Sequence, residues 1–369
     1  MNAKPMSSID RAETTRPPLT PLDFGDLAGF DTDDLLAAFY VFHTSCAAIA
    51  AQTQPLRPAV LPSAGLRKIA LEALARPVRT HDEARRFFRT HFLPYLIEKP
   101  GNGELNAFFT GYYEPLVAGS LTQNPDFSAP ILARPDNLDG LSPYPVRAKI
   151  EAGAIDTHTR PLVWVKDPVE AFMIQVQGSA RVRLVDGRVL RLVYAGRNGA
   201  PYVSIGRILI ERGEIRAADM SPVVLKNWIR AHGQGPGEPG LALMQSNPSY
   251  VFFDLQEESG PACGPIGGQG FGLTALRSIA IDRSLWPYGQ PFWIDAELPC
   301  SKFSSAKFQR LMIAQDTGSA ILGAARADIF FGSGDDAGIR AGDIRHKGYM
   351  VVLLPAKEEW PQMEVVEGE

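Results

Sequence analysis

Apolar positions recur at helical spacing in residues 31–98, and from Asn106 onward they fall in short alternating or aromatic runs. Apolar residues repeating at i and i+4 behind an acidic start are typical of helices that bury one face. We therefore expect helices at 35–51, 62–74 and 81–88. Asp31 or Thr32 is expected to cap the first helix, because a short polar side chain can accept hydrogen bonds from the first free amides.

Strands are expected in most of the remaining chain. Runs that alternate or are rich in aromatic and β-branched residues predict strands at 107–113, 171–178, 180–184, 189–194 and through most of 250–354. The pair Asp186-Gly187 lies between two of these runs and is a strong signal for a hairpin turn. The segment 299–308 resembles a second hairpin.

Two helices and a linker are expected to interrupt these strands. The first helix covers 204–212 and ends at Gly213, and the second covers 221–232. Ser221 is a good cap for the second helix, and Pro222 is well tolerated at the first helical position. The following run, GQGPGEPG at 233–240, reads as a linker. Asp335, Asp336 and Asp343 are expected in solvated turns.

Composition narrows the class of protein. The chain has 369 residues, 45% hydrophobic and 21% charged, with a net charge of −4. These are globular values, and the length allows two domains with separate cores. The negative charge and the lack of a basic patch with interleaved aromatics argue against a nucleic-acid partner. The three Cys and six His show no metal-ligand spacing, so we expect no metal and no cofactor.

The chain ends bear on location. Residues 1–30 lack an apolar core, so they are expected to be a disordered segment and not a signal peptide, and 358–369 a flexible tail. The apolar run 35–51 is too short and too often interrupted to cross a bilayer. No lipid-attachment pattern surrounds Cys46. From the residues alone, no export address is expected.

Three aspartates occupy apolar stretches where a carboxylate is costly. Asp316 ends one apolar run, Asp328 begins another, and Asp282 lies inside a third. Buried carboxylates need partners, so these positions indicate either a structural hydrogen-bond cluster or an acid/base site. The glycine-rich run 264–272 lacks the pattern of a nucleotide-binding loop. It is either a loop that leads into a strand or a loop that contacts a sugar.

An ordered set of motifs connects these features. They are Thr110-Gly-Tyr-Tyr-Glu-Pro, Phe172-Met-Ile-Gln-Val-Gln-Gly-Ser, Tyr194-Ala-Gly-Arg-Asn-Gly, Ser204-Ile-Gly, Asn247-Pro-Ser-Tyr-Val-Phe-Phe, Asp282-Arg-Ser-Leu-Trp-Pro-Tyr-Gly, Gln315-Asp-Thr-Gly-Ser-Ala-Ile and Ala327-Asp-Ile-Phe-Phe-Gly. Over residues 30–355 this set resembles the lytic murein transglycosylase A family, with its C-terminal three-aspartate domain.

The resemblance implies a fold. It is mainly β with N-terminal helices, and comprises a double-psi β-barrel domain and an inserted second domain that is β-barrel-like. The barrel domain would be discontinuous, covering 31–111 and 241–357, and the insert would cover 112–240. The glycan would lie in a groove between the two domains. The order of helices, strands, linker and strands along the chain fits this arrangement.

The resemblance also implies a reaction in peptidoglycan. The enzyme would be a lyase that cleaves the β-1,4 bond between N-acetylmuramic acid and N-acetylglucosamine and leaves 1,6-anhydromuramic acid ends. One carboxyl group can serve both proton transfers, because the muramic acid O6 supplies the nucleophile. By its motif, Asp328 would be this acid/base, with a raised pKa, and Asp316 and Asp282 would support it or be purely structural.

The resemblance suggests further site residues, partners and a location. Candidate substrate contacts are Tyr112, Tyr113, Gln177, Gly178, Ser179, Tyr194, Asn198 and Gly332. Each of the tyrosines could equally belong to the core. We expect peptidoglycan glycan strands as the partner, other cell-wall enzymes as a second class of partner, and a monomer. The family works in the periplasm or at the outer membrane.

Two other functions remain open from the sequence. A non-catalytic glycan-binding or wall-loosening protein would bind glycan and release no product. A glycoside hydrolase would use Asp328 as acid and Asp316 or Asp282 as base, and would give reducing ends. A metal site formed by the three aspartates is a weaker alternative.

Overall fold

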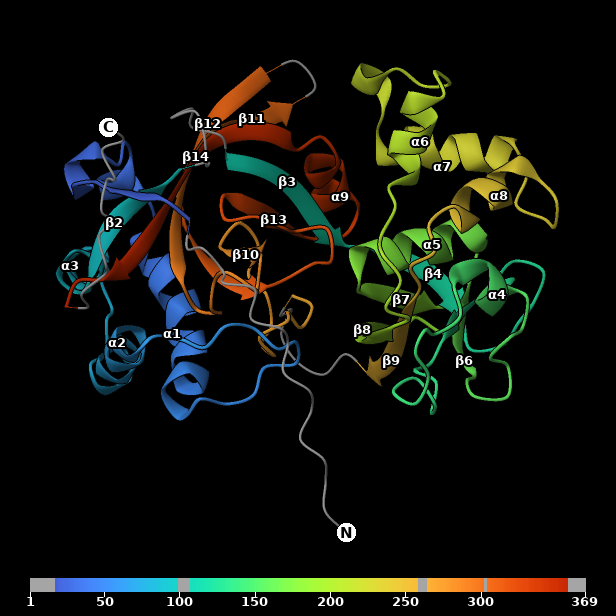
Figure 1. The fold of residues 1–369 in the computed structure, drawn as a ribbon, viewed down its shortest axis with the longest axis horizontal. Helices are drawn as coiled ribbons and strands as arrows, with labels where there is room; N and C mark the ends of the chain where they lie inside the picture. Colours follow the sequence, from blue (N-terminus) through green and yellow to red (C-terminus); the bar gives the residue numbers. More distant parts are fainter. Residues whose placement is uncertain (1–16, 99–106, 258–263, 302–303, 358–369) are drawn as a thin grey trace, which may run out of the picture.

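The computed structural model describes residues 17–98, 107–257, 264–301 and 304–357. These ranges form two units that lie side by side, a barrel with flanking helices and an inserted sheet with its own helices (Figure 1). No helix within these ranges is long and apolar enough to cross a membrane. The architecture is mainly β with helices near the N-terminus, as the sequence predicts.

Eight strands form the first sheet, and six of them close into a barrel. The strands are β1 (Leu19–Pro21), β2 (Phe92–Ile97), β3 (Ala107–Glu114), β10 (Ser278–Ile281), β11 (Pro291–Ser301), β12 (Ser304–Asp316), β13 (Arg326–Ser333) and β14 (Arg345–Pro355). The closed ring runs β14-β11-β12-β10-β13-β3 and returns to β14. Strand β14 makes the closure because its residues 345–348 pair with β3, whereas 351–355 pair with β2.

Helices cover one side of this barrel. They are α1 (Leu35–Ala51), α2 (Ala64–Ala75) and α3 (His81–His91), and a fourth helix, α9 (Asp335–Gly342), lies against β3 and β13. The first three confirm the expected helices. Helix α1 buries Leu35, Phe39 and Phe42, which lie one helical turn apart, against barrel residues such as Trp293. Asp34, and not Asp31 or Thr32, caps α1, because its carboxylate accepts the Ala37 N–H at 3.0 Å.

The N-terminal residues from 17 onward are ordered, which corrects the expected disordered segment 1–30 for this part. Two short 3₁₀ turns, η1 (Phe24–Asp26) and η2 (Phe30–Thr32), follow β1. Phe30 packs on Trp293, and β1 pairs with β2. Asp33, which directly follows η2, accepts hydrogen bonds from both terminal nitrogens of Arg277 at 2.7 Å. Residues 1–16 and the expected tail 358–369 lie outside the described ranges.

The inserted unit has a six-stranded sheet. Its strands are β4 (Leu116–Ser120), β5 (Ala129–Leu132), β6 (Pro161–Val165), β7 (Ala180–Leu184), β8 (Val189–Arg197) and β9 (Val251–Glu257), in the order β5-β6-β4-β7-β8-β9. Its helices are α4 (Arg147–Glu151), α5 (Pro168–Gln177), α6 (Ile205–Glu211), α7 (Pro222–Ala231) and α8 (Pro239–Gln245), with the 3₁₀ turn η3 (Ala217–Asp219). A bridge between Ala133 and Phe253 brings the two edges of this sheet together.

Several local expectations are confirmed in this unit. The Asp186-Gly187 turn joins β7 and β8 in an antiparallel hairpin. Ser221 caps α7 with Pro222 at its first position, and Ser204 caps α6. Strands β11 and β12 likewise form the hairpin expected at 299–308.

Three segments differ from expectation. The strand predicted at 171–178 is helix α5, which Asp167 caps and Pro168 opens. Its apolar run is continuous because several faces of the helix are buried, and such a run cannot be told from a buried strand by periodicity. The expected linker ends in α8, and Asp335 and Asp336 lie in the first turn of α9, where acidic side chains favour the helix dipole.

The return from the insert to the barrel comes later than position 241. Strand β9 pairs with β8 along seven residue pairs, so the chain stays in the inserted sheet up to Glu257. The outward crossing lies at Glu114, the last residue of β3, since β4 begins at Leu116. Both crossings place the two units in direct contact beside β3 and β13 (Figure 1).

Candidate functional site

A row of residues runs across four neighbouring barrel strands. Asp316 ends β12 and lies opposite Ala280 of β10, Ala280 lies opposite Asp328 of β13, and Asp328 lies opposite Thr110 of β3. Neighbouring strands are about 4.8 Å apart, so the backbones of the two aspartates are separated by roughly 10 Å. The two carboxylates therefore belong to one patch and influence each other through their charges.

Strand periodicity places this patch on the outer face of the barrel. Ala327, Ile329 and Phe331 are buried in the barrel core. Because successive side chains of a strand point to opposite faces, Arg326 and Asp328 point outward. The same alternation in β3 buries Phe109 inside and leaves Thr110 on the outer side.

Thr110 holds one oxygen of Asp328, and Arg326 in turn holds the Thr110 hydroxyl. The Thr110 hydroxyl donates to Asp328 Oδ1 at 2.5 Å, and Arg326 Nη2 donates to the same hydroxyl at 2.7 Å. Burial raises the pKa of Asp328 to about 6; the nearby Arg326 charge and the Thr110 hydrogen bond oppose this rise, and the Asp316 charge adds to it. The carboxyl group is therefore poised to exchange a proton close to neutral pH.

Asp316 is held from two sides. The Gly268 N–H donates to Oδ1 at 2.8 Å, and the Tyr112 hydroxyl donates to Oδ2 at 2.9 Å. Burial and the two aspartate charges raise the pKa of Tyr112 well above its usual range, so its hydroxyl remains a donor. Position 268 has no room for a side chain, since a Cβ there would lie 2.5 Å from the Tyr288 hydroxyl. The glycine-rich loop thus supports an aspartate.

Asp282 directly follows β10, and its hydrogen bonds differ from those of the other two aspartates. Its Oδ1 accepts the N–H and hydroxyl of Ser284 at 3.0 and 2.6 Å, and its Oδ2 accepts the Gly323 N–H at 2.7 Å. These bonds close the turn after β10 and tie it to the loop before β13. Its oxygens are thus directed at the polypeptide, and no bond joins Asp282 to Asp316 or Asp328 in the described structure. The three aspartates do not form a common cluster.

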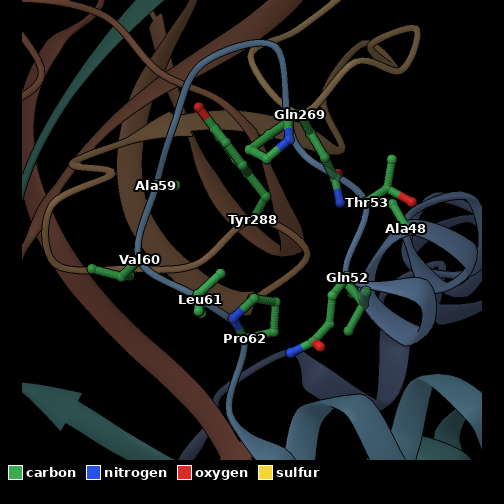
Figure 2. Close-up of a pocket in the computed structure, with 11 residues that line it drawn as sticks. Ala48, Gln52, Thr53, Ala59, Val60, Leu61, Pro62, Gln269 and Tyr288 are labelled. Atoms are coloured by element: carbon green, nitrogen blue, oxygen red, sulfur yellow. The ribbon is translucent and has the colours of Figure 1, made fainter. Parts of the chain in front are cut away.

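Tyr194 of the inserted sheet reaches the barrel through an arginine. The Arg57 guanidinium lies 3.9 Å from the centre of the Tyr194 ring, and its Nη1 donates to the Thr317 carbonyl at 2.6 Å. Thr317 directly follows Asp316. Arg57 belongs to the loop between α1 and α2, which lines a small pocket with Gln269 and Tyr288 (Figure 2).

Tyr113 and Gln177 lie on a different side of β3 from Tyr112. The Tyr113 N–H donates to Gln177 Oε1 at 3.2 Å. Both residues line an open pocket of about 150 Å³ between the two units. The other lining residues are Thr110, Gly111, Pro222, Ala341, Gly342, Ile344 and Arg345. Thr110 thus connects this pocket to Asp328.

Of the remaining candidates, Gly178, Gly332 and Asn198 have backbone roles. Gly178 adopts φ 79° as the C-cap of α5, with Ser179 next to it before β7, and Gly332 adopts φ 111° where the β13 pairing with β3 is irregular. Asn198 is buried, and its amide bonds the carbonyls of Pro145 and Pro248 and the N–H of Tyr250. Its amide oxygen and nitrogen both bond loop backbone, so Asn198 has a structural role in this fold.

Four residues that the sequence did not predict either contact the aspartate patch or link it to the inserted unit. Arg326 precedes Asp328 by two positions, and strand periodicity alone could have placed both on one face. Thr110 is the first residue of one of the motifs, but nothing in that motif marks it as a partner of Asp328. Glu114, fully buried at the unit crossing, and Arg57 in an irregular loop give no local signal of their partners. Within the described ranges, no group of three or more His, Cys, Asp or Glu is arranged to hold a metal ion.

Models of two protein families match the chain. The MltA specific insert domain matches residues 108–254, which run from β3 through β8 into the first half of β9, with the helices between them. The 3D domain matches residues 277–354, which cover β10 to β14. The two matches coincide with the inserted sheet and with the aspartate-bearing part of the barrel.

Relatives and solved structures agree with these matches. The membrane-bound lytic murein transglycosylase A of Escherichia coli K12 is 37% identical over 257 residues, 68% of this chain and 66% of its own length. The crystal structure of a membrane-bound lytic murein transglycosylase from Agrobacterium tumefaciens has a TM-score of 0.80 and 30% identity, covering 92% of this chain and 98% of that one. E. coli MltA with bound chitohexaose has a TM-score of 0.64 and 28% identity, covering 93% and 95%.

Proposed function

Since this chain belongs to the membrane-bound lytic murein transglycosylase A family, we propose that it is a lytic transglycosylase acting on peptidoglycan in cell-wall remodelling and turnover. It cleaves the β-1,4 bond between N-acetylmuramic acid and N-acetylglucosamine and forms 1,6-anhydromuramic acid ends. The observation that carries this proposal is the outward-facing Asp328, whose pKa is raised to about 6 beside a second carboxylate and an arginine.

Asp328 performs both proton transfers in this mechanism. Protonated at the start, it donates to the glycosidic oxygen as the bond to the muramic acid C1 breaks. The muramic acid O6 then attacks C1, and the Asp328 carboxylate accepts the proton that O6 releases. No water is consumed, and the nucleophile is held in the same sugar ring as the carbon it attacks. Thr110 holds Oδ1, and Arg326 holds the Thr110 hydroxyl, so Oδ2 is the oxygen that faces the substrate.

Asp316 and Tyr112 act as positioning residues. The charge of Asp316 favours the protonated form of Asp328 before reaction and, as positive charge develops on the sugar, stabilises it. Tyr112 and the Gly268 N–H keep Asp316 in place. Asp282 has a structural role in the turn after β10. We propose Tyr112 and Tyr194 as ring contacts for sugars, and Gln177 and Ser179 as more distant polar contacts.

The finer architecture is part of the same proposal. Two parallel pairs, β10 with β12 and β13 with β3, within a closed six-stranded ring support a double-psi barrel. The barrel unit then comprises the described residues up to β3 and those from 264 onward, and the inserted unit lies between them in the sequence. We propose that the glycan lies along the junction of the two units, that the enzyme is a monomer, and that it works in the periplasm or at the outer membrane, where its substrate is.

Product analysis tests the reaction. Purified peptidoglycan is incubated with the protein, and the released fragments are measured by mass spectrometry. Anhydro ends, about 18 Da lighter than the hydrolytic ends of a general-base reaction with water, are expected. Reducing ends would indicate a glycoside hydrolase, and glycan binding without any product would indicate a binding protein. Either result would overturn the proposed reaction.

Thr110→Val is expected to move the pH dependence of activity upward. The Thr110 hydrogen bond favours the ionised form of Asp328, so its loss raises the pKa of that carboxyl group. A hydrogen bond of this kind contributes about 1 kcal/mol, so the alkaline limb of kcat/KM should shift by roughly half a unit to one unit. Thr110→Ser, which keeps the hydroxyl, is the control, and an unchanged limb in Thr110→Val would contradict the assignment.

A further inference from the structure

Arg57 contacts both the inserted unit and the barrel, and it has no acidic partner among the described residues. In the described ranges, no Asp or Glu side chain forms an ion pair with it. The two most buried arginines of the described structure do have acidic partners, Arg277 with Asp33 and Arg147 with Glu151. Partial burial of a guanidinium without a counter-charge costs free energy, unless solvent reaches the group or a ligand brings a negative charge.

The loop that carries Arg57 is firmly attached to the barrel. The Arg57 N–H donates to the Gly268 carbonyl at 3.0 Å, and the Val60 N–H donates to the Arg283 carbonyl at 2.9 Å. Gly268 also binds Asp316 through its own N–H. The guanidinium position is therefore defined relative to the acid/base patch and is not that of a free surface arginine.

The contacts of Arg57 leave part of its guanidinium available. Its Cζ lies over the Tyr194 ring, and Nη1 donates to the Thr317 carbonyl. A guanidinium has five N–H donors, so the remaining edge can bind a planar carboxylate with two parallel hydrogen bonds. Its charge also reaches Tyr112, whose raised pKa it partly lowers. Arg57 thus lies close to Asp316, which would otherwise repel an anionic ligand.

We propose that Arg57 binds a carboxylate carried by the glycan and thereby distinguishes muramic-acid-containing strands from neutral ones. This inference rests on the proposed function. N-acetylmuramic acid bears a lactyl carboxyl group, which is free in strands without peptides, whereas stem peptides carry carboxylates of their own. N-acetylglucosamine has neither. The shared chemistry is a carboxylate next to the sugar backbone, and Arg57 offsets the repulsion from Asp316.

Calorimetric binding in the Asp328→Asn background tests this proposal without turnover. The probes are chitohexaose, which is neutral, glycan strands without peptides, and glycan strands with peptide stems. Arg57→Gln is expected to weaken binding of at least one carboxylate-bearing probe about tenfold, as expected for loss of a charge-assisted pair. Chitohexaose affinity should change less than twofold. Arg57→Lys should recover part of the loss, because it keeps the charge but not the fork.

The outcomes distinguish the two possible sources of the carboxylate, and they test the role of Arg57 separately from the proposed function. A loss confined to strands without peptides identifies the lactyl carboxylate, and a loss confined to peptide-bearing strands identifies the stem. Arg207→Gln is the charge-matched control, since Arg207 lies on α6 away from the barrel (Figure 1) and pairs with Glu211 at the surface. Equal losses for all three probes, or no loss, would overturn the role of Arg57. If the parent protein binds no probe, the proposed function falls as well.

Discussion

Asp328→Asn is expected to lower kcat/KM for release of anhydro ends by about a thousandfold or more, because general acid–base catalysis alone contributes about 10² to 10⁴. The amide cannot donate the proton to the leaving oxygen, nor accept one from O6. Its shape is nearly that of the acid, so the hydrogen bonds around Thr110 have little reason to rearrange. The measurement is the initial rate of fragment release, with binding to glycan checked separately.

The control for this variant is Asp336→Asn. Asp336 is an exposed carboxylate in the first turn of α9, close to β13 in sequence but outside the patch. Its substitution should leave the rate within about twofold, as for surface changes away from functional contacts. If Asp328→Asn retains more than a tenth of the activity, Asp328 is not the acid/base and Asp316 becomes the next candidate.

The pH dependence of the native protein follows from the same group. Asp328 must be protonated at the start, so activity should fall as the pH rises through about 6. The folded state also binds more protons than the unfolded chain between the usual Asp pKa and about 6. Stability from this group is therefore highest below that window, decreases through it and is lost above it.

Asp328→Asn should consequently stabilise the protein at high pH while abolishing its activity. At pH 8 the native Asp328 is ionised in a half-buried site, and the asparagine is not. Allowing for partial solvent access, the free energy of unfolding of the variant should exceed that of the native protein by about 2 kcal/mol at pH 8, and by less at pH 5. Urea denaturation at both pH values measures this difference. An equal effect at the two values would show that Asp328 is not desolvated.

Glu114→Gln is expected to destabilise the protein by about 3–5 kcal/mol, because it removes the charge of a buried carboxylate that pairs with two mostly buried arginines. Glu114 is fully buried, and its two oxygens lie 3.0 Å from Nε of Arg181 and of Arg191. These arginines face each other on β7 and β8. Ser333, at the end of β13, donates to the same carboxylate at 2.7 Å. One side chain thus joins the inserted sheet to the strand that bears Asp328.

The free energy of unfolding from chemical denaturation checks this prediction. Glu211→Gln serves as the control, since it removes an exposed i,i+4 pair with Arg207 and should cost less than about 1 kcal/mol. Activity should fall more than stability alone explains, because the placement of Tyr194 relative to Asp328 depends on this junction. A cost for Glu114→Gln as small as that of the control would mean that solvent compensates the arginines.

The sequence predicted those elements that are stabilised by residues close to one another in the chain. The cap and first-turn pattern of α7, the Asp186-Gly187 hairpin and the apolar periodicity of α1 each involve residues within a few positions of one another. Helix α5 was misassigned because an apolar run buried on several sides has no period to read. The end of the inserted unit was predicted too early, at 240, because the pairing of β9 with β8 that extends it joins residues some sixty positions apart.

The sequence by itself determined the family, the mainly β architecture with N-terminal helices, and Asp328 and Asp316 as costly carboxylates in apolar strands. Tertiary structure alone decided which partners they have. The bonds from Thr110 to Asp328 and from Tyr112 to Asp316 join residues 218 and 204 positions apart, and Arg57 meets Tyr194 across two units. The physical reason is that burial and neighbouring charges set a pKa, and both arise only when barrel closure brings distant strands together.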